Sequence, residues 1–180
     1  MFTTTGSRIV RYYWRRVGIY VAVVCLLVPS RQILAETVKF RIINYITKLE
    51  IIPIEDTEGH MIGIYQRRGL ALFENGEVAT ETSWATFDGV KGKGTFQGYS
   101  KLNYEDGSTT VSKYKGKMWR IQDGKIRLEE GSGEYFRGTG RFEGITGTMS
   151  WTGKRFTPYS KEVGADNLLD VTAIYSIPSK

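Results

Sequence analysis

The chain has very few of the residues on which metal binding and nucleophilic catalysis depend. Its 180 residues include one histidine, His60, one cysteine, Cys25, and four prolines. Zinc sites built mainly from His and Cys, disulfides and Cys–His nucleophile pairs are therefore excluded or nearly so. A long apolar stripe with the 3.6-residue period of a helix is also missing. We expect no metal and no cofactor, and the sequence indicates compartment and fold better than function.

An excess of positive charge is confined to the N-terminal segment. The formal net charge is +6, but residues 1–35 hold five arginines and no acid. Residues 36–180 are left with 20 Lys and Arg against 19 Asp and Glu. A nucleic-acid-binding domain carries its positive charge as a patch on the folded part. We therefore expect no nucleic acid among the partners.

Residues 1–35 follow the order of a secretory signal peptide. Four arginines precede the twelve-residue apolar run Val17–Val28, and Ala35 supplies a small residue for cleavage. Twelve helical residues span about 18 Å, which is short of a hydrocarbon core of ~30 Å, so we favour a cleaved leader over the alternative of a membrane anchor. We predict an exported protein, periplasmic or extracellular. Residues 36–180 would form its one domain, without membrane contact once the leader is removed.

Alternation of apolar and polar residues with period two recurs through residues 36–180 and indicates strands. The dipeptides Asn75-Gly76, Asp88-Gly89, Asp106-Gly107 and Asp123-Gly124 are typical of hairpin turns. Together these signals predict eight strands, at roughly 38–47, 60–73, 77–87, 95–104, 108–119, 125–137, 146–155 and 168–177.

Eight long antiparallel strands predict a closed barrel, because an open sheet would leave two exposed edges. The fold class is all-β, an eight-stranded antiparallel up-and-down barrel. Its lumen is either filled by side chains or holds one small ligand. An outer-membrane barrel is the alternative, but Arg67 and Arg68 are adjacent within one strand. One of them would face lipid at a cost of about 2–4 kcal/mol near the midplane, so we favour a soluble barrel.

The most specific pattern lies near the C-terminus. The spacing G-x-G-x-F-x-G-x-x-G is made by Gly138, Gly140, Phe142, Gly144 and Gly147, with Glu143 inside it. A dinucleotide site would need G-x-G-x-x-G between a strand and a helix, whereas a strand is expected on both sides here. We predict a tight corner whose glycines stand where a Cβ would clash, with Phe142 plugging one end of the barrel.

This corner resembles the one shared by allene oxide cyclases and dirigent proteins. The whole chain is also similar to uncharacterised exported bacterial proteins, on Gly59-His60, Phe73–Glu77 and Gly138–Gly144. The resemblance implies an eight-stranded barrel, commonly a trimer, with a pocket for a small apolar or phenolic ligand and no cofactor. The glutamate that cyclases use near their first strands has no counterpart in residues 38–55, so cyclase activity does not carry over. The charged cavity residues of dirigent proteins also have no matching positions.

Aromatic residues on the expected strands are the candidate ligand contacts, because a tyrosine combines a ring for contact with a hydroxyl for orientation. The candidates are Tyr65, Trp84, Tyr104 and Tyr114. Alternation places Tyr114 on the face opposite Lys113, Lys115 and Lys117. Because a face of lysines is wet, we expect Tyr104 and Tyr114 to point inward. That the rings simply fill the interior is the alternative.

Two ionisable residues, His60 and Glu81, are the candidates for acid–base catalysis. His60 follows the acidic run Glu55–Glu58, which lacks the ligand spacing of an EF-hand and is interpreted as a solvated turn.

Three hypotheses for function remain open at this point. The first is a barrel that binds a small apolar or aromatic molecule in its lumen, without a cofactor. The second is an isomerase or cyclase that holds a reactive substrate in a folded conformation. The third is a filled barrel, a homotrimer being one option, that serves as a structural or interaction module. An empty lumen of roughly 300 Å³ or more favours the first two, and an inward ionisable group with a perturbed pKa favours the second.

Overall fold

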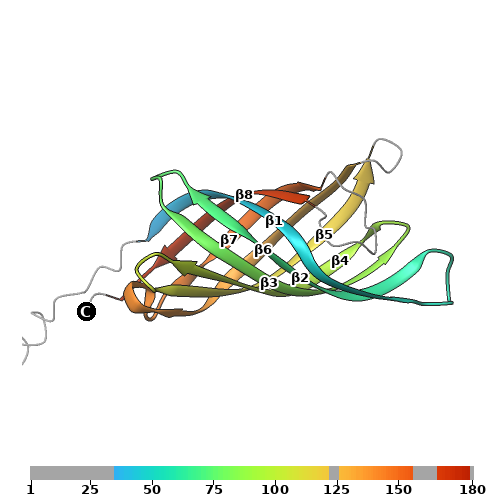
Figure 1. The fold of residues 1–180 in the computed structure, drawn as a ribbon, viewed down its shortest axis with the longest axis horizontal. Coiled ribbons are helices and arrows are strands. Elements are labelled where there is room, and N and C mark those ends of the chain that lie inside the picture. The colour runs from blue at the N-terminus through green and yellow to red at the C-terminus, as the bar shows by residue number, and fades with distance from the viewer. Residues whose placement is uncertain (1–34, 122–125, 156–165, 179–180) are drawn as a thin grey trace, which may run out of the picture. The chain divides into compact units, whose positions relative to one another are not determined.

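The computed structural model describes residues 35–121, 126–155 and 166–178, and it confirms the closed eight-stranded antiparallel barrel (Figure 1). Each strand pairs with the next along the chain, and the last pairs back with the first. The strands are β1 (Glu36–Pro53), β2 (His60–Phe73), β3 (Val78–Val90), β4 (Lys93–Tyr104), β5 (Thr109–Ile121), β6 (Ile126–Thr139), β7 (Thr146–Arg155) and β8 (Asp166–Ser176). The predicted leader, apart from Ala35, and the predicted turn at Asp123-Gly124 lie outside the described residues.

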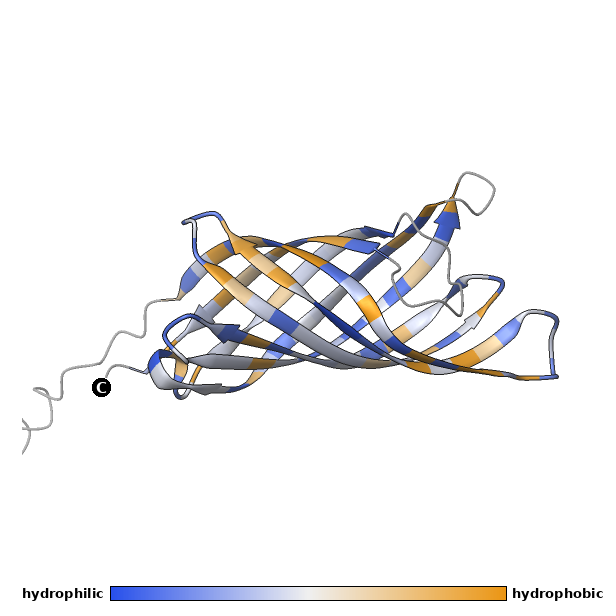
Figure 2. Cartoon of the chain, in the orientation of Figure 1, coloured by the Kyte–Doolittle hydropathy of each residue, from blue (hydrophilic) through white to orange (hydrophobic). Residues whose placement is uncertain are grey.

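Side chains alternate between the lumen and the outer surface, as the period-two pattern predicts. Along β3, Glu81 and Ser83 are buried, whereas Thr80, Trp84 and Thr86 are exposed. Figure 2 shows hydrophobic and hydrophilic residues interspersed along the strands, as this alternation requires. The described part of the chain contains no helix with the length and apolar character needed to cross a membrane.

The strands are strongly staggered around the barrel. Directly paired residues can be followed once around the barrel, from Arg41 of β1 to β8 and on to β2. This path returns to β1 at Ile52, so the stagger between its start and its end is 11 residues. A bulge between Ile46 and Lys48 supplies one of these residues. Strand number and stagger together set the width of a barrel, and with eight strands the lumen is narrow enough for side chains to fill.

Three of the predicted turn dipeptides lie within the described residues, and two of them are found at turns. Gly76 and Gly107 adopt positive φ angles of 86° and 79° in the β2–β3 and β4–β5 turns. The turn predicted at Asp88-Gly89 is wrong, because both residues belong to β3 and the chain reverses at Lys91-Gly92. A Cβ at Gly89 would lie 3.3 Å from Cε of Met118, so this glycine makes room inside the barrel.

Aromatic rings close the end of the barrel that holds the β6–β7 corner. The ring centroids of Tyr104 and Phe142 lie 4.6 Å apart, as do those of Phe40 and Phe73. The guanidinium of Arg141 stacks over Tyr104 and Phe142 at 4.9 and 4.7 Å. We call the rings of Phe40, Phe73, Tyr104 and Phe142 the aromatic plug.

The corner itself consists of a short 3-10 helix, η1 (Gly140–Phe142), and the turn that follows it. A Cβ at Gly138 would lie 2.0 Å from the carbonyl oxygen of Phe142, so no other residue fits there without displacing the backbone. Gly140 has φ of +63°, a left-handed conformation that L side chains rarely adopt. The glycines therefore fold the chain tightly enough for Phe142 to turn into the lumen.

Candidate functional site

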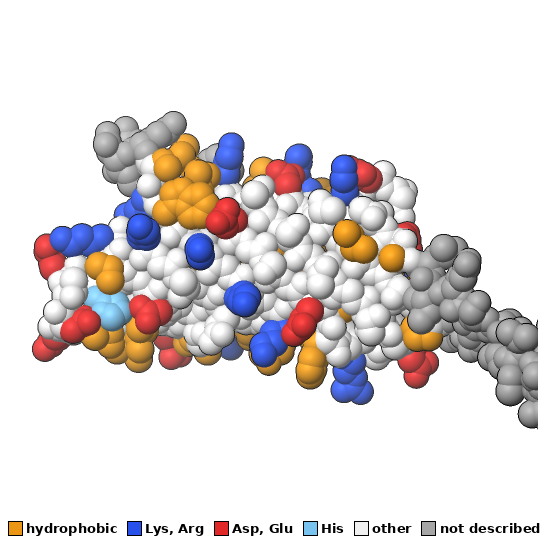
Figure 3. All heavy atoms as spheres, turned by 180° about the vertical axis from the view of Figure 1, so that it is seen from behind, with side chains coloured by type: hydrophobic (Ala, Val, Ile, Leu, Met, Phe, Trp, Pro, Cys, Tyr) orange, Lys and Arg blue, Asp and Glu red, His pale blue; other side chains and the backbone are white. Residues whose placement is uncertain are grey.

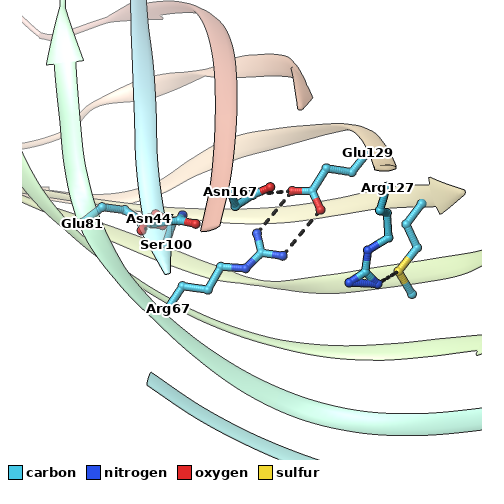
Figure 4. A network of polar contacts seen from close by, with 8 residues as sticks. Asn44, Arg67, Glu81, Ser100, Arg127, Glu129 and Asn167 are labelled. Atoms are coloured by element: carbon cyan, nitrogen blue, oxygen red, sulfur yellow. Dashed lines mark hydrogen bonds and ion pairs between the residues drawn. The ribbon is translucent and has the colours of Figure 1, made fainter. Parts of the chain in front are cut away.

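The middle of the lumen contains a buried ion pair. Arg67 of β2 and Glu129 of β6 both point inward, and Nη1 of the arginine donates a hydrogen bond to Oε1 of the glutamate at 3.2 Å (Figure 4). Their side chains are only 5% and 2% exposed. Asn167 of β8 donates a second hydrogen bond to the same oxygen at 3.0 Å.

The electrostatics around Glu129 keep it ionised. Burial acts to raise the pKa of its carboxyl, but the guanidinium groups of Arg67, Arg155 and Arg127 outweigh burial and lower that pKa to about 2. Arg127 also donates a hydrogen bond to Sδ of Met118 at 3.1 Å. Three strands thus bring cationic side chains to one buried carboxylate.

A second buried carboxyl, Glu81 of β3, has a different environment. Asn44 donates a hydrogen bond to its Oε2 at 3.1 Å, and the Ser100 hydroxyl donates one to its Oε1 at 3.0 Å (Figure 4). Burial raises the pKa of Glu81, against the opposing effects of hydrogen bonds from Asn44 and Ser83 and of the charge on Arg67. The pKa of Glu81 is thus raised and that of Glu129 is lowered. In enzymes, opposite pKa shifts of two neighbouring carboxyls separate the acid from the base.

The space left between these groups is small. A cavity of about 50 Å³ lies in the lumen between polar groups such as Ser112, Tyr114 and Glu129 and apolar ones such as Phe96 and Trp151. This volume is a third of the ~150 Å³ cavity that admits benzene in an engineered protein. It suffices for a few water molecules at about 10–15 Å³ each, and the surrounding hydroxyls and carboxylate can bind them.

The four predicted ligand contacts separate into three groups. Tyr114 lines the cavity, and burial raises the pKa of its hydroxyl to about 12. Tyr65 points inward and packs under the guanidinium of Arg67 at 4.6 Å, and Tyr104 belongs to the aromatic plug. Trp84 does not line the lumen, contrary to our expectation, because its side chain is 43% exposed on the outer face.

The two predicted acid–base candidates are not brought together. Glu81 lies in the lumen, whereas His60 lies at the start of β2, where its side chain is 18% exposed. His60 Nδ1 is 2.6 Å from Asp56 and Nε2 is 2.9 Å from Asp88. Hydrogen bonds to Asp56 and then to Asp88 raise the pKa of the imidazole. This arrangement ties the β1–β2 turn to β3.

Sequence reasoning missed the inward charges of β6 and their partners. Arg127 and Glu129 alternate with Leu128 and Glu130, so the pattern shows two faces but does not tell which is inside. The neighbours Arg67 and Arg68 do predict one charge inside the barrel. Successive side chains of a strand point to opposite faces, so one of the two arginines must point inward. Among the described residues, no three His, Cys, Asp or Glu side chains are grouped to hold a metal ion.

The outer surface carries three aromatic rings that lie close together. We call Trp84 of β3, Tyr99 of β4 and Phe136 of β6 the aromatic strip; their side chains are 43%, 44% and 67% exposed. Trp84 and Tyr99 are directly opposite in the β3–β4 ladder, and the rings of Tyr99 and Phe136 are 6.1 Å apart. Charged side chains of both signs are scattered over the outer surface, as one face shows in Figure 3.

The chain is similar in structure to two pterocarpan synthase dirigent proteins, GePTS1 and PsPTS1. GePTS1 has 9% sequence identity and a TM-score of 0.46, over 83% of this chain and 91% of its own. PsPTS1 has 12% identity and a TM-score of 0.44, over 81% of this chain and 97% of its own. At such values the similarity says nothing about what this chain binds. No protein-family model and no curated protein matches the sequence.

Proposed function

We propose that this protein acts through the outer face of its barrel, as an interaction module, and that the lumen serves to hold the barrel together. The observation that carries the proposal is the cavity volume of about 50 Å³, far below the roughly 300 Å³ at which ligand pockets begin. Side chains of all eight strands occupy the rest of the lumen. A drug-sized apolar or phenolic molecule has no room inside this conformation.

The outer face supports the same proposal. A contiguous group of exposed rings on a monomeric surface marks an interaction site more often than isolated apolar residues do. Phe136 is also placed by a specific backbone feature. Val111 pairs with Arg137 and Ser112 with Tyr135, so Phe136 is the extra residue of a bulge. Bulges are over-represented where a side chain is re-aimed for function, and this one turns Phe136 toward Tyr99.

Native mass spectrometry of the protein purified from its own host tests this proposal. We expect the mass of the polypeptide alone, under conditions gentle enough to retain a ligand held by several kcal/mol. A small molecule that stays bound to the wild type and is lost on substitution of Glu81 by glutamine would contradict the proposal.

Ligand binding in the lumen is the second candidate function, and one observation favours it. Buried ionisable groups stabilise a core less well than apolar filling does, so their presence at a cavity is a functional signal. The Arg67–Glu129 pair lines the cavity and would recognise the polar group of a small apolar or phenolic ligand, without a cofactor. Glu81, whose pKa is raised, is linked to the cavity by its hydrogen bond from the lining residue Ser100. Glu81 would also be the proton donor if the barrel acts as an isomerase or cyclase. Both versions require cavity-lining rings to move aside.

A further inference from the structure

The aromatic strip lies next to a surface with a marked excess of positive charge. The outward positions of β4, β5 and β6 carry six cationic side chains and two acidic ones. The cations are Lys93, Lys101, Lys113, Lys115, Lys117 and Arg137, and the acids are Glu130 and Glu134. The six cations take part in no ion pair within the described part of the chain. The outer positions of β4–β6 therefore have a net charge of four positive units. The outer positions of β3, β7 and β8 add Lys154 and three acids, Asp88, Asp166 and Asp170.

The strip and the cations are interleaved. Lys113 stands directly opposite Tyr99 in the β4–β5 ladder, so a lysine side chain leaves the sheet next to the middle residue of the strip. Lys101 stands opposite Val111, which in turn stands opposite Arg137, the residue after Phe136. A molecule that stacks on the rings would thus meet cations along one side.

A groove continues from this place around the barrel. An open hollow of about 620 Å³ runs over β4 to β8 and begins at Gln97 and Lys113, next to Tyr99. Four of its twelve lining residues have small hydroxyl side chains, namely Ser132, Thr148, Ser150 and Thr172, and the charged ones are Lys113, Lys115 and Glu134. Hydroxyl and amide groups of this kind donate and accept hydrogen bonds at once, which suits a partner rich in hydroxyl groups.

We propose that the outer face of β3–β8 binds an anionic polysaccharide. This inference rests on the proposed function and names its partner. The C–H face of a pyranose is attracted to the negative face of an aromatic ring, so the strip would hold successive sugars. Carboxylates on the polymer would lie against Lys113 and Lys115, and its hydroxyls would bind in the groove. Export, which the leader predicts, would bring this face into contact with such polymers.

The modest basicity of the chain favours an anionic sugar polymer over a single-stranded nucleic acid. Aromatic rings and lysines also bind nucleic acids, but those are held by strongly basic channels. Here residues 36–180 hold 20 basic against 19 acidic residues, and the excess is confined to one face.

The test is isothermal titration of the purified protein with polygalacturonate, with neutral dextran and with an oligothymidylate of 20 nucleotides. We expect binding of polygalacturonate that weakens as NaCl is raised from 20 to 200 mM, and much weaker binding of the other two. The triple variant Trp84→Ala/Tyr99→Ala/Phe136→Ala should weaken polygalacturonate binding at least tenfold. Lys113→Gln/Lys115→Gln should weaken it less and flatten its salt dependence.

Tyr45→Ala is the matched control, because Tyr45 is 46% exposed on the outer face of β1 and should leave binding unchanged. Circular dichroism must show that each variant retains the fold. Absence of polygalacturonate binding, equal binding by the triple variant, or tighter binding of the oligothymidylate would overturn the inference. If any of these outcomes is found and native mass spectrometry shows the polypeptide alone, only the polysaccharide inference fails and the proposed function stands. A molecule bound in the lumen would contradict both the proposed function and the polysaccharide inference.

Discussion

The inner and outer faces of this barrel use the same residue types for opposite purposes. Inside, Arg67 and Glu129 form a pair that is almost fully buried, whereas outside Lys113 and Glu134 face each other without an ion pair of 4 Å or less. Inside, Tyr104 and Phe142 pack ring on ring, whereas outside Tyr99 and Phe136 remain about half or more exposed. Charges and rings inside are committed to the fold, and those outside are free to meet a partner.

The largest effect on stability should come from breaking the buried pair. Glu129→Gln leaves several buried guanidiniums without their carboxylate, and we expect a loss of about 3–5 kcal/mol in the free energy of unfolding. Urea denaturation measures this loss. The double variant Arg67→Met/Glu129→Gln should lose less than the sum of the two single variants, because the two groups are coupled. Additive losses would show that the pair has no mutual role.

The aromatic plug should matter almost as much. Phe142→Ala removes a ring that is 5% exposed and packs on Tyr104, so we expect a loss of about 3 kcal/mol. Phe136→Ala removes a ring of the same size that is 67% exposed and should cost less than about 0.5 kcal/mol. Equal losses in thermal or urea unfolding would refute the contrast between the two faces.

The pH dependence of stability should report the charge on Glu129. Its pKa is lowered to about 2 in the fold, so its contribution is present above the ordinary pKa of 4.5 and is lost as pH falls from about 5 to 2. The loss should amount to about 3 kcal/mol. The effect of Glu81 on stability has the opposite sign. Its pKa is raised in the fold, so its contribution to stability falls as pH rises above 4.5. Unfolding of wild type, Glu129→Gln and Glu81→Gln across this range separates the two groups, and identical profiles would contradict the assignment.

The smallest predicted effect concerns His60. Hydrogen bonds to Asp56 and Asp88 raise the pKa of the imidazole, so any stability it adds is present at low pH and is lost as pH rises through the raised pKa. Because His60 is the only histidine, a proton NMR titration follows it without assignment. Asp56→Asn should lower the measured pKa, and Glu58→Gln, in the same turn, should not.

Most of the fold could be predicted from the sequence because alternation and turn residues are local signals. The bounds predicted at 60–73 and 146–155 agree with β2 and β7. The first strand was predicted to end at residue 47 but continues to Pro53, because the bulge after Ile46 interrupts the alternation. An interrupted alternation does not by itself tell a bulge from the end of a strand, because only the pairing with β2 distinguishes the two.

The site was harder to predict, because the choice of inner face depends on the whole barrel. Trp84 is outside since its strand sends small or polar residues such as Ser83 and Ala85 inward, where Tyr65 and Phe87 already occupy the width. From the sequence of this strand alone, Trp84 would be assigned to the core and the polar residues to the surface. Here the narrow lumen reverses that rule, and only the register of the neighbouring strands reveals it.

Recognition of a partner outside the barrel and recognition inside it predict opposite effects of two sets of substitutions. Titration of polygalacturonate into two folded variants, Trp84→Ala/Tyr99→Ala and Glu81→Gln, measures this directly. We predict that the first loses at least tenfold in affinity and that the second binds like the wild type. Full binding by the first together with loss by the second would place recognition in the lumen and contradict the account.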